Sequence, residues 1–206
     1  LTDVHVLTVE RGPRSFTVVA ETASSLAGCP GCGVLATGHG RREVLLHDLP
    51  CAGVPVRVLW RKRILRCRED ACEISTFSEV HELAAPRAKL TTRAIAWAVT
   101  QLRSHDIAVS ALADMLGVAW NTVWHAVAPV IEGQLAAEDR LAGVDALGVD
   151  EHVWRHVGPP GTGLVTGIVD HSRGEDGRPR ARLLDLVKGR TGAAYGDWLA
   201  TQGPGF

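Results

Sequence analysis

The sequence predicts an α+β protein, with β-rich segments at both ends and a helical region between them. Three observations lead to this class. Two cysteine pairs lie in the first half, and the two cysteines of each pair are only a few residues apart. The pairs bracket 34 residues of strand-like sequence. Apolar side chains then repeat with a period near 3.6 over residues 90–127. Short apolar runs separated by Gly-rich turns follow over residues 146–187.

The cysteine pairs have the spacing of a four-thiolate metal site. Cys29 and Cys32 form a C-x₂-C turn, and Cys67 and Cys72 form a C-x₄-C pair. Zn²⁺ binds four such sulfurs in a tetrahedron at about 2.3 Å. We therefore expect a structural Zn²⁺ site, with redox-active or simply buried thiols as the alternatives. The fifth thiol, Cys51, is expected to be a small core residue.

Composition restricts the function classes. The chain has 206 residues, a formal net charge of −1 and 46% hydrophobic residues. It contains no apolar run long enough to cross a bilayer, so no membrane partner is expected. The near-neutral charge means that nucleic-acid binding must depend on local clusters of cations. An intact thiol quartet with an odd cysteine favours a reducing, cytoplasmic location.

Strands are expected at residues 16–20, 44–49 and 54–67. In the last of these, one face carries valines and Trp60 while the other carries arginines. Six cations fall within twelve residues: Arg57, Arg61, Lys62, Arg63, Arg66 and Arg68. One interpretation is a strand edge that contacts nucleic-acid phosphates. The other, compatible with it, is a solvated face that offsets the charge of a zinc–thiolate centre.

Three helices are expected in the middle of the chain. The first opens after Pro86 with Thr91 or Thr92 as its cap, and the second and third cover 110–116 and 120–127. Two short helices joined by a turn at Gly117 are typical of a helix-turn-helix. With Val123 and Val127 inward, the outward residues of the third helix would be Asn121, Trp124 and His125. These three and Thr122 are the candidate DNA contacts of this helix. The alternative is a plain three-helix bundle in which Trp120 and Trp124 are core residues.

A three-stranded antiparallel meander is expected from runs at 146–154, 164–170 and 181–187, followed by a helix at 192–201. Asp150 lies in the middle of the first of these strands. A carboxylate there is disfavoured unless it binds something. A separate metal site formed by Asp150, His152 and His156 is an alternative, because these residues share one strand face.

The order of these parts resembles the ISL3 class of bacterial insertion-sequence transposases. The resemblance rests on Cys-Pro-Gly-Cys-Gly at 29–33, the basic strand, the second cysteine pair, the helix-turn-helix and Gly-Val-Asp-Glu at 148–151. It implies a β-rich zinc-ribbon-like module at 1–82, a helix-turn-helix DNA-binding unit at 83–142 and an incomplete RNase H-like domain at 143–206. It also implies that Cys29, Cys32, Cys67 and Cys72 are the zinc ligands.

The resemblance further implies a catalytic role for Asp150 and a DNA partner. Asp150 matches the first acid of a DDE triad that holds Mg²⁺ or Mn²⁺ in intact relatives. The second Asp and the Glu would follow residue 197, beyond the end of this sequence, and Asp170 and Asp185 are expected to be structural. We therefore expect a truncated transposase that binds double-stranded DNA at the element's terminal inverted repeats near the nucleoid, self-associates, and does not catalyse alone. The alternatives are a non-catalytic DNA-binding regulator and a zinc-stapled interaction module.

Overall fold

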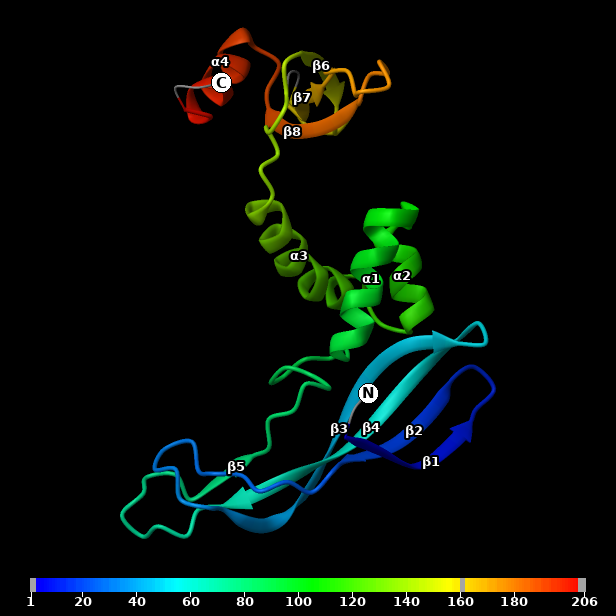
Figure 1. The fold of residues 1–206 in the computed structure, drawn as a ribbon. Coiled ribbons are helices and arrows are strands. Elements are labelled where there is room, and N and C mark those ends of the chain that lie inside the picture. Colours follow the sequence, from blue (N-terminus) through cyan, green and yellow to red (C-terminus); the bar gives the residue numbers. More distant parts are fainter. Residues whose placement is uncertain (1–2, 160–161, 204–206) are drawn as a thin grey trace. The chain divides into compact units, whose positions relative to one another are not determined.

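The computed structural model describes residues 3–159 and 162–203 and has the expected α+β architecture (Figure 1). The chain divides into two compact units, with the boundary between Gln134 and Leu135. The elements of the first unit are β1 (Val4–Arg11), β2 (Phe16–Thr22), β3 (Thr37–Cys51), β4 (Val54–Arg66), β5 (Thr76–Ser78), α1 (Thr92–His105), α2 (Val109–Leu116) and most of α3 (Trp120–Ala137). Those of the second are β6 (Leu147–Val153), β7 (Leu164–Asp170), β8 (Arg182–Lys188) and α4 (Gly192–Thr201).

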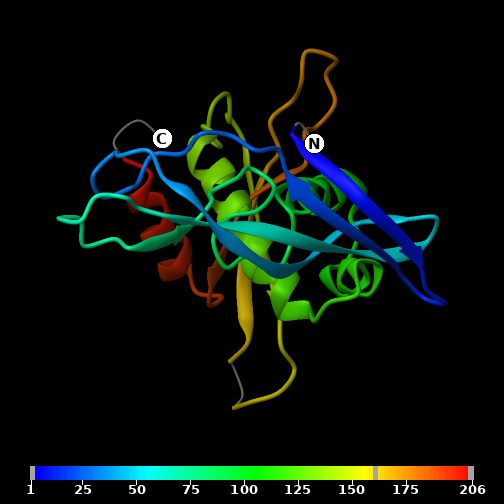
Figure 2. The same ribbon diagram turned by 90° about the horizontal axis from the view of Figure 1, so that it is seen from below.

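A long hairpin of β3 and β4 is the central element of the first unit (Figures 1 and 2). Its turn residues Ala52 and Gly53 both have positive φ, of 50° and 77°, as a two-residue hairpin of this twist requires. The sheet order is β1-β2-β4-β3, with β2 parallel to β4 and β5 paired to the end of β4. On one face, Leu46, Val58 and Trp60 are almost completely buried.

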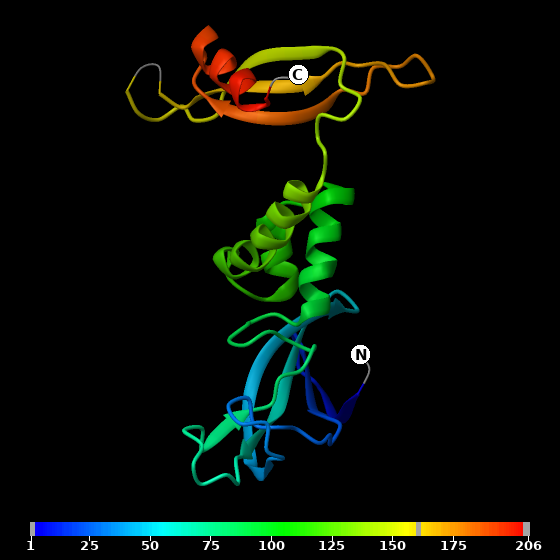
Figure 3. The same ribbon diagram turned by 60° about the vertical axis from the view of Figure 1, so that its left-hand side comes forward.

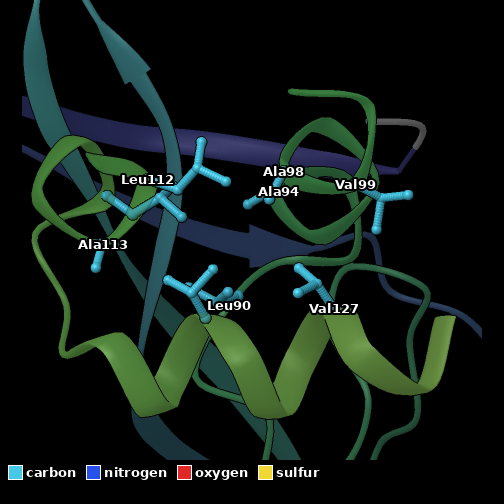
Figure 4. Close-up of a cluster of buried hydrophobic side chains, with 9 residues drawn as sticks. Leu90, Ala94, Ala98, Val99, Leu112, Ala113 and Val127 are labelled. Atoms are coloured by element: carbon cyan, nitrogen blue, oxygen red, sulfur yellow. The ribbon is translucent and has the colours of Figure 1, made fainter. Parts of the chain in front are cut away.

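The three helices share one apolar core, shown in Figure 4. Leu90, which precedes α1, points into the space between the helices and is 1% exposed. Ala94 and Ala98 of α1 and Leu112 of α2 have no exposed surface. The remaining buried members are Val99, Ala113, Leu116, Val123 and Val127.

The start of α1 is tied to the sheet by a polar network. Thr91 caps the helix, because its hydroxyl accepts a hydrogen bond from the N–H of Ala94 at 3.2 Å. The same hydroxyl donates to the Asp48 carboxylate of β3 at 2.6 Å, and the Arg93 guanidinium pairs with that carboxylate. Asp48 is 1% exposed, so its charge is buried and fully paired.

The second unit is the expected antiparallel meander, in the order β6-β7-β8. Helix α4 covers one face of it, where Ile168, Leu184 and Trp198 form the core. Thr191 caps α4 by accepting a hydrogen bond from Ala194 N–H.

Several sequence expectations differ from the structure in extent. Strand β3 is much longer than 44–49, since its first half pairs with the cysteine-proximal end of β4. Strand β1 was not expected; as an edge strand it leaves Val6 and Val9 about 60% exposed, so its pattern carries no buried face. Helix α3 continues ten residues beyond Val127. Cys51 is exposed at the end of β3 rather than buried in the core, which corrects the expectation for that thiol.

Candidate metal centre and nucleic-acid interface

The four cysteines of the two pairs converge at one point. Their sulfur atoms all lie within 4.8 Å of one another, with Cys29 Sγ 3.8 Å from Cys72 Sγ and Cys32 Sγ 3.5 Å from Cys67 Sγ. Four sulfurs held about 2.3 Å from one Zn²⁺ would be about 3.8 Å apart, so the spacing fits a tetrahedral zinc site. Within residues 3–159 and 162–203, no other group of three or more His, Cys, Asp or Glu side chains gathers in this way.

Each of the two cysteine pairs lies in a turn that directs backbone N–H groups at sulfur. Gly31 N–H points to Cys29 Sγ at 3.5 Å, Glu69 N–H to Cys67 Sγ at 3.4 Å and Ile74 N–H to Cys72 Sγ at 3.4 Å. Gly31 is needed for close approach, because a Cβ there would lie 3.1 Å from the Ile74 side chain and 3.4 Å from Cys72 Sγ. The sequence therefore places glycine where the two knuckles meet.

The backbone contacts also adjust the acidity of the thiols. The hydrogen bond from Gly31 N–H lowers the pKa of Cys29 to about 7, against the opposing effect of burial. Backbone N–H groups also act on the other three thiols, but burial and the neighbouring sulfurs outweigh them and raise the pKa values of Cys32, Cys67 and Cys72. A cation is therefore what allows all four to be thiolates together, which is the role that structural zinc performs.

The knuckle loops, residues 23–36 and 67–75, lie at the end of the β3–β4 hairpin farthest from the three helices (Figures 1 and 3). Cys67 directly follows β4, and its N–H donates to Ser75 O at 3.0 Å. Because β5 then pairs with the end of β4, the second knuckle is closed between two paired strands.

The cations of β4 have different environments. Arg57 is exposed, whereas Arg61 pairs with Glu21 at 2.9 Å and is 43% exposed. Lys62 is only 7% exposed, and its ammonium lies 4.4 Å from the Trp60 ring centroid. Arg63 is 15% exposed and pairs with the buried Glu79 carboxylate at 2.8 Å. Only Arg57 of these four is therefore free of a visible partner within the described part of the chain.

The outward and inward faces of α3 are those that the helical pattern predicted. Val123 and Val127 have no exposed surface, while Asn121, Trp124 and His125 are exposed and Thr122 is half-buried. The alternative in which Trp120 and Trp124 are core residues is wrong. They are 46% and 42% exposed and stack on each other with ring centroids 5.7 Å apart.

A groove of about 400 Å³ lies beside the first two turns of α3. One wall is the segment 86–90 that leads into α1, and the other carries Asn121, Thr122 and His125. Sequence reasoning did not single out this segment. Its only signal was the pair of cations at Arg87 and Lys89 immediately before the helix cap.

In the second unit, Asp150 is exposed at the centre of β6 and faces Gly167 across the ladder. One of its carboxylate oxygens accepts a hydrogen bond from Glu151 N–H at 2.8 Å. Asp150 and Glu151 line a groove of about 440 Å³ together with Arg190 and Thr191. His152 and His156 form no three-residue cluster with Asp150.

Asp170 and Asp185 have structural partners. Asp170 has no exposed surface, accepts a hydrogen bond from Ser172 N–H at 2.9 Å and lies 3.4 Å from the Arg182 guanidinium. These contacts, the Ser172 bonds first among them, lower its pKa. Asp185 accepts a hydrogen bond from Trp198 Nε1 at 2.9 Å and so holds α4 on the sheet.

Comparisons with known families identify both parts of the first unit. Residues 25–72, which contain the four cysteines, match the zinc-finger of transposase IS204/IS1001/IS1096/IS1165. Residues 79–130 match the helix-turn-helix domain of transposase family ISL3. No curated protein sequence and no solved structure matches the chain significantly.

These matches agree with the geometry. The first covers the thiolate site and the second covers α1, α2 and the exposed face of α3, so zinc is structural here and the helices form a DNA-binding unit. No helix among the described residues is long and apolar enough to cross a membrane. The two modules are adjacent and in the order expected, so residues 25–130 are similar to the zinc-finger and helix-turn-helix domains of ISL3-class insertion-sequence transposases.

Proposed function

We propose that this transposase recognises the terminal inverted repeats of an insertion sequence, with the exposed face of α3 in the DNA major groove. The observation that carries the proposal is the division of α3 into two faces. Val123 and Val127 fix the helix on its neighbours, and Asn121, Trp124 and His125 are left exposed on the other side. Asn pairs well with the N6 and N7 edge of adenine, and a helix of this kind reads bases through its N-terminal residues.

The contacts divide between base reading and phosphate binding. Asn121, Thr122, Trp124 and His125 read or pack against bases, while Arg57 contacts a phosphate. Arg61 contributes to phosphate binding only by exchanging its pair with Glu21. Lys62 and Arg63 act indirectly, by holding β4 in place through Trp60 and Glu79. In this proposal residues 1–82, 83–142 and 143–206 are the zinc module, the DNA-binding unit and the start of a DDE domain.

The test is a comparison of two duplexes, one carrying the terminal inverted repeat of the element that encodes the chain and one scrambled. The wild-type chain should prefer the first, and Asn121→Ala should reduce that preference by about 1–3 kcal/mol, the value of one lost bidentate base contact. Ser104→Ala, at an exposed position of α1, is the control and should leave the preference unchanged. Equal affinity of the wild-type chain for both duplexes would refute the proposal.

For the second unit, we propose that Asp150 is the first carboxylate of a metal-binding triad. Two-metal phosphoryl transfer needs several carboxylates around cations about 3.5–4 Å apart. Among the described residues, no three carboxylate or histidine side chains gather closely enough to hold a metal ion. These residues therefore do not fit a complete Mg²⁺ or Mn²⁺ site. Residues 1–206 alone should then bind DNA without cutting it, and Asp150→Ala should leave binding unchanged. Mg²⁺-dependent cleavage that Asp150→Ala abolishes would contradict this.

Self-association would bring two element ends together, and we propose it as part of the same function. Sedimentation of the chain with and without inverted-repeat duplex tests it. A non-catalytic regulator is the second outcome that the cleavage experiment would allow, because it would bind the same DNA and share the same first unit.

A further inference from the structure

The segment 86–90, which we call the basic arm, forms one wall of the groove beside α3. It is anchored at its end by main-chain bonds. His47 N–H of β3 donates to Lys89 O at 2.8 Å, and Thr91 N–H donates to His47 O at 3.0 Å. Leu90 between these bonds is buried in the helical core. The arm therefore holds a fixed position against both the sheet and the helices.

The side chains of the basic arm are available for a partner. Arg87 and Lys89 are exposed, and neither has a carboxylate within ion-pair distance among the residues that the structure describes. Arg61 and Arg63, by contrast, are paired with Glu21 and Glu79. Arg57 extends the cationic surface, because it lies opposite His47 in the β3–β4 ladder and His47 is bonded to Lys89.

Arg87 also has an unusual backbone. Its φ is +64°, in the left-handed region that favours glycine. A chain that needed only a turn here would be more stable with glycine, so the arginine side chain is kept at a conformational cost. Such a residue points to a role for the side chain outside the fold.

The residues on the opposite wall of the groove indicate which partner the basic arm binds. It is formed by Asn121, Thr122 and His125, which belong to the face of α3 that the proposed function places against bases. When a helix lies in the major groove, the protein surface along its flank meets the phosphates of the adjoining strand. Two unpaired cations along that flank have the charge and the position to contact them.

We propose that the basic arm is a second DNA contact of this transposase, in which Arg87 and Lys89 bind backbone phosphates next to the bases that α3 reads. This inference rests on the proposed function, since it requires the same duplex on α3. It adds two residues that fix the register of the duplex on the protein and carry no base preference themselves.

The experiment measures affinity against salt concentration for the full chain with Arg87→Gln and Lys89→Gln together. Loss of two phosphate contacts should lower the magnitude of the slope of log K against log[salt] by about 1.8. Affinity for the inverted-repeat and scrambled duplexes should fall by about the same factor, of roughly tenfold or more at 0.1 M salt. Arg14→Gln with Arg42→Gln removes the same charge at exposed positions elsewhere and should change neither quantity more than about twofold.

Arg87→Gly separates binding from folding. It relieves the positive φ, so the thermal midpoint should stay the same or rise, while DNA affinity falls. Arg87→Lys should keep most of the affinity. A doubly substituted or Arg87→Gly chain that binds with wild-type affinity and salt slope would overturn the inference while leaving the proposed function intact. If the wild-type chain itself prefers no duplex, both fail.

Discussion

At the residue scale, the four cysteines explain why a long hairpin ends in two turns of irregular chain. Knuckle loops of this size bury little apolar surface, and the metal replaces the core that they lack. The sequence spacing was enough to predict which four thiols converge, because C-x₂-C and C-x₄-C turns restrict where sulfur atoms can lie. The exposure of the fifth thiol could not be predicted from its residue type, because Cys51 lies next to the β3–β4 turn at the end of the hairpin.

Replacement of single cysteines tests the metal site. Cys29→Ser or Cys67→Ser should lower the zinc content from about one per chain and unfold the knuckle loops, because structural zinc supplies folding free energy. Cys51→Ser is the matched control, an exposed thiol outside the cluster, and should retain both zinc and structure. Metal analysis with circular dichroism measures the two effects. A folded Cys29→Ser chain without zinc would contradict the assignment.

The cations of β4 show where sequence reasoning stops. Their alternation with valines was clear, but the partner of Arg63 is Glu79, sixteen residues further along the chain. No local pattern reports that pairing, because β5 brings Glu79 back beside β4. Lys62 was counted among the candidate DNA contacts, but it alternates with the arginines, and its side chain lies over Trp60 and is 7% exposed.

The buried Glu79 makes stability depend on pH. Burial raises the pKa of Glu79, but the Arg63 N–H, the Thr22 hydroxyl and the Arg63 guanidinium together hold it below its usual value of 4.5. A carboxyl group whose pKa is lower in the folded state stabilises the fold at pH values above its unfolded-state pKa. That stabilisation disappears as the pH falls through the folded-state pKa.

We therefore expect the first unit to lose stability below about pH 4.5, and Glu79→Gln to flatten this dependence while costing about 3 kcal/mol at neutral pH. Urea unfolding followed between pH 3 and 7 measures both effects. Glu43→Gln, at an exposed position of β3, is the control and should keep the wild-type pH profile. An unchanged profile in Glu79→Gln would show that the pair does not govern the acid limb.

At the element scale, the turn between α2 and α3 sets the orientation of α3. Gly117 ends α2 with φ +66°, and its N–H bonds to the helix carbonyls. A Cβ at this position would lie 3.0 Å from Pro55 Cβ at the start of β4. The turn is thus seated on the sheet. The glycine stop was visible in the sequence, but its contact with β4 was not.

Two glycine substitutions distinguish the stabilising effect of this turn from the general effect of glycine on helix stability. Gly117→Ala should destabilise the first unit by about 1–2 kcal/mol, because it adds strain at a positive φ and a close contact with Pro55. Gly133→Ala, in α3 with open space around it, should stabilise the helix by up to about 1 kcal/mol. Thermal unfolding compares the two. A stabilised Gly117→Ala would mean that the turn can move away from the sheet.

At the scale of the whole molecule, the order of parts carried more information than any single motif. Strand β7 and helix α4 have the predicted bounds, whereas β1 was missed and β3 underestimated. The errors fall where a strand is buried on neither face or where its partner is distant in sequence. The site residues of the first unit depended less on those errors, because zinc ligation and the exposed face of α3 both follow from short-range spacing.

Photo-crosslinking is the direct test of whether the exposed face of α3 recognises DNA. The full chain would be crosslinked to an inverted-repeat duplex that carries halogenated pyrimidines, and the modified peptides would be identified by mass spectrometry. We expect crosslinks within residues 118–128 that are lost when a scrambled duplex is used at the same concentration. Crosslinks confined to residues 147–203, or equal labelling with both duplexes, would contradict it.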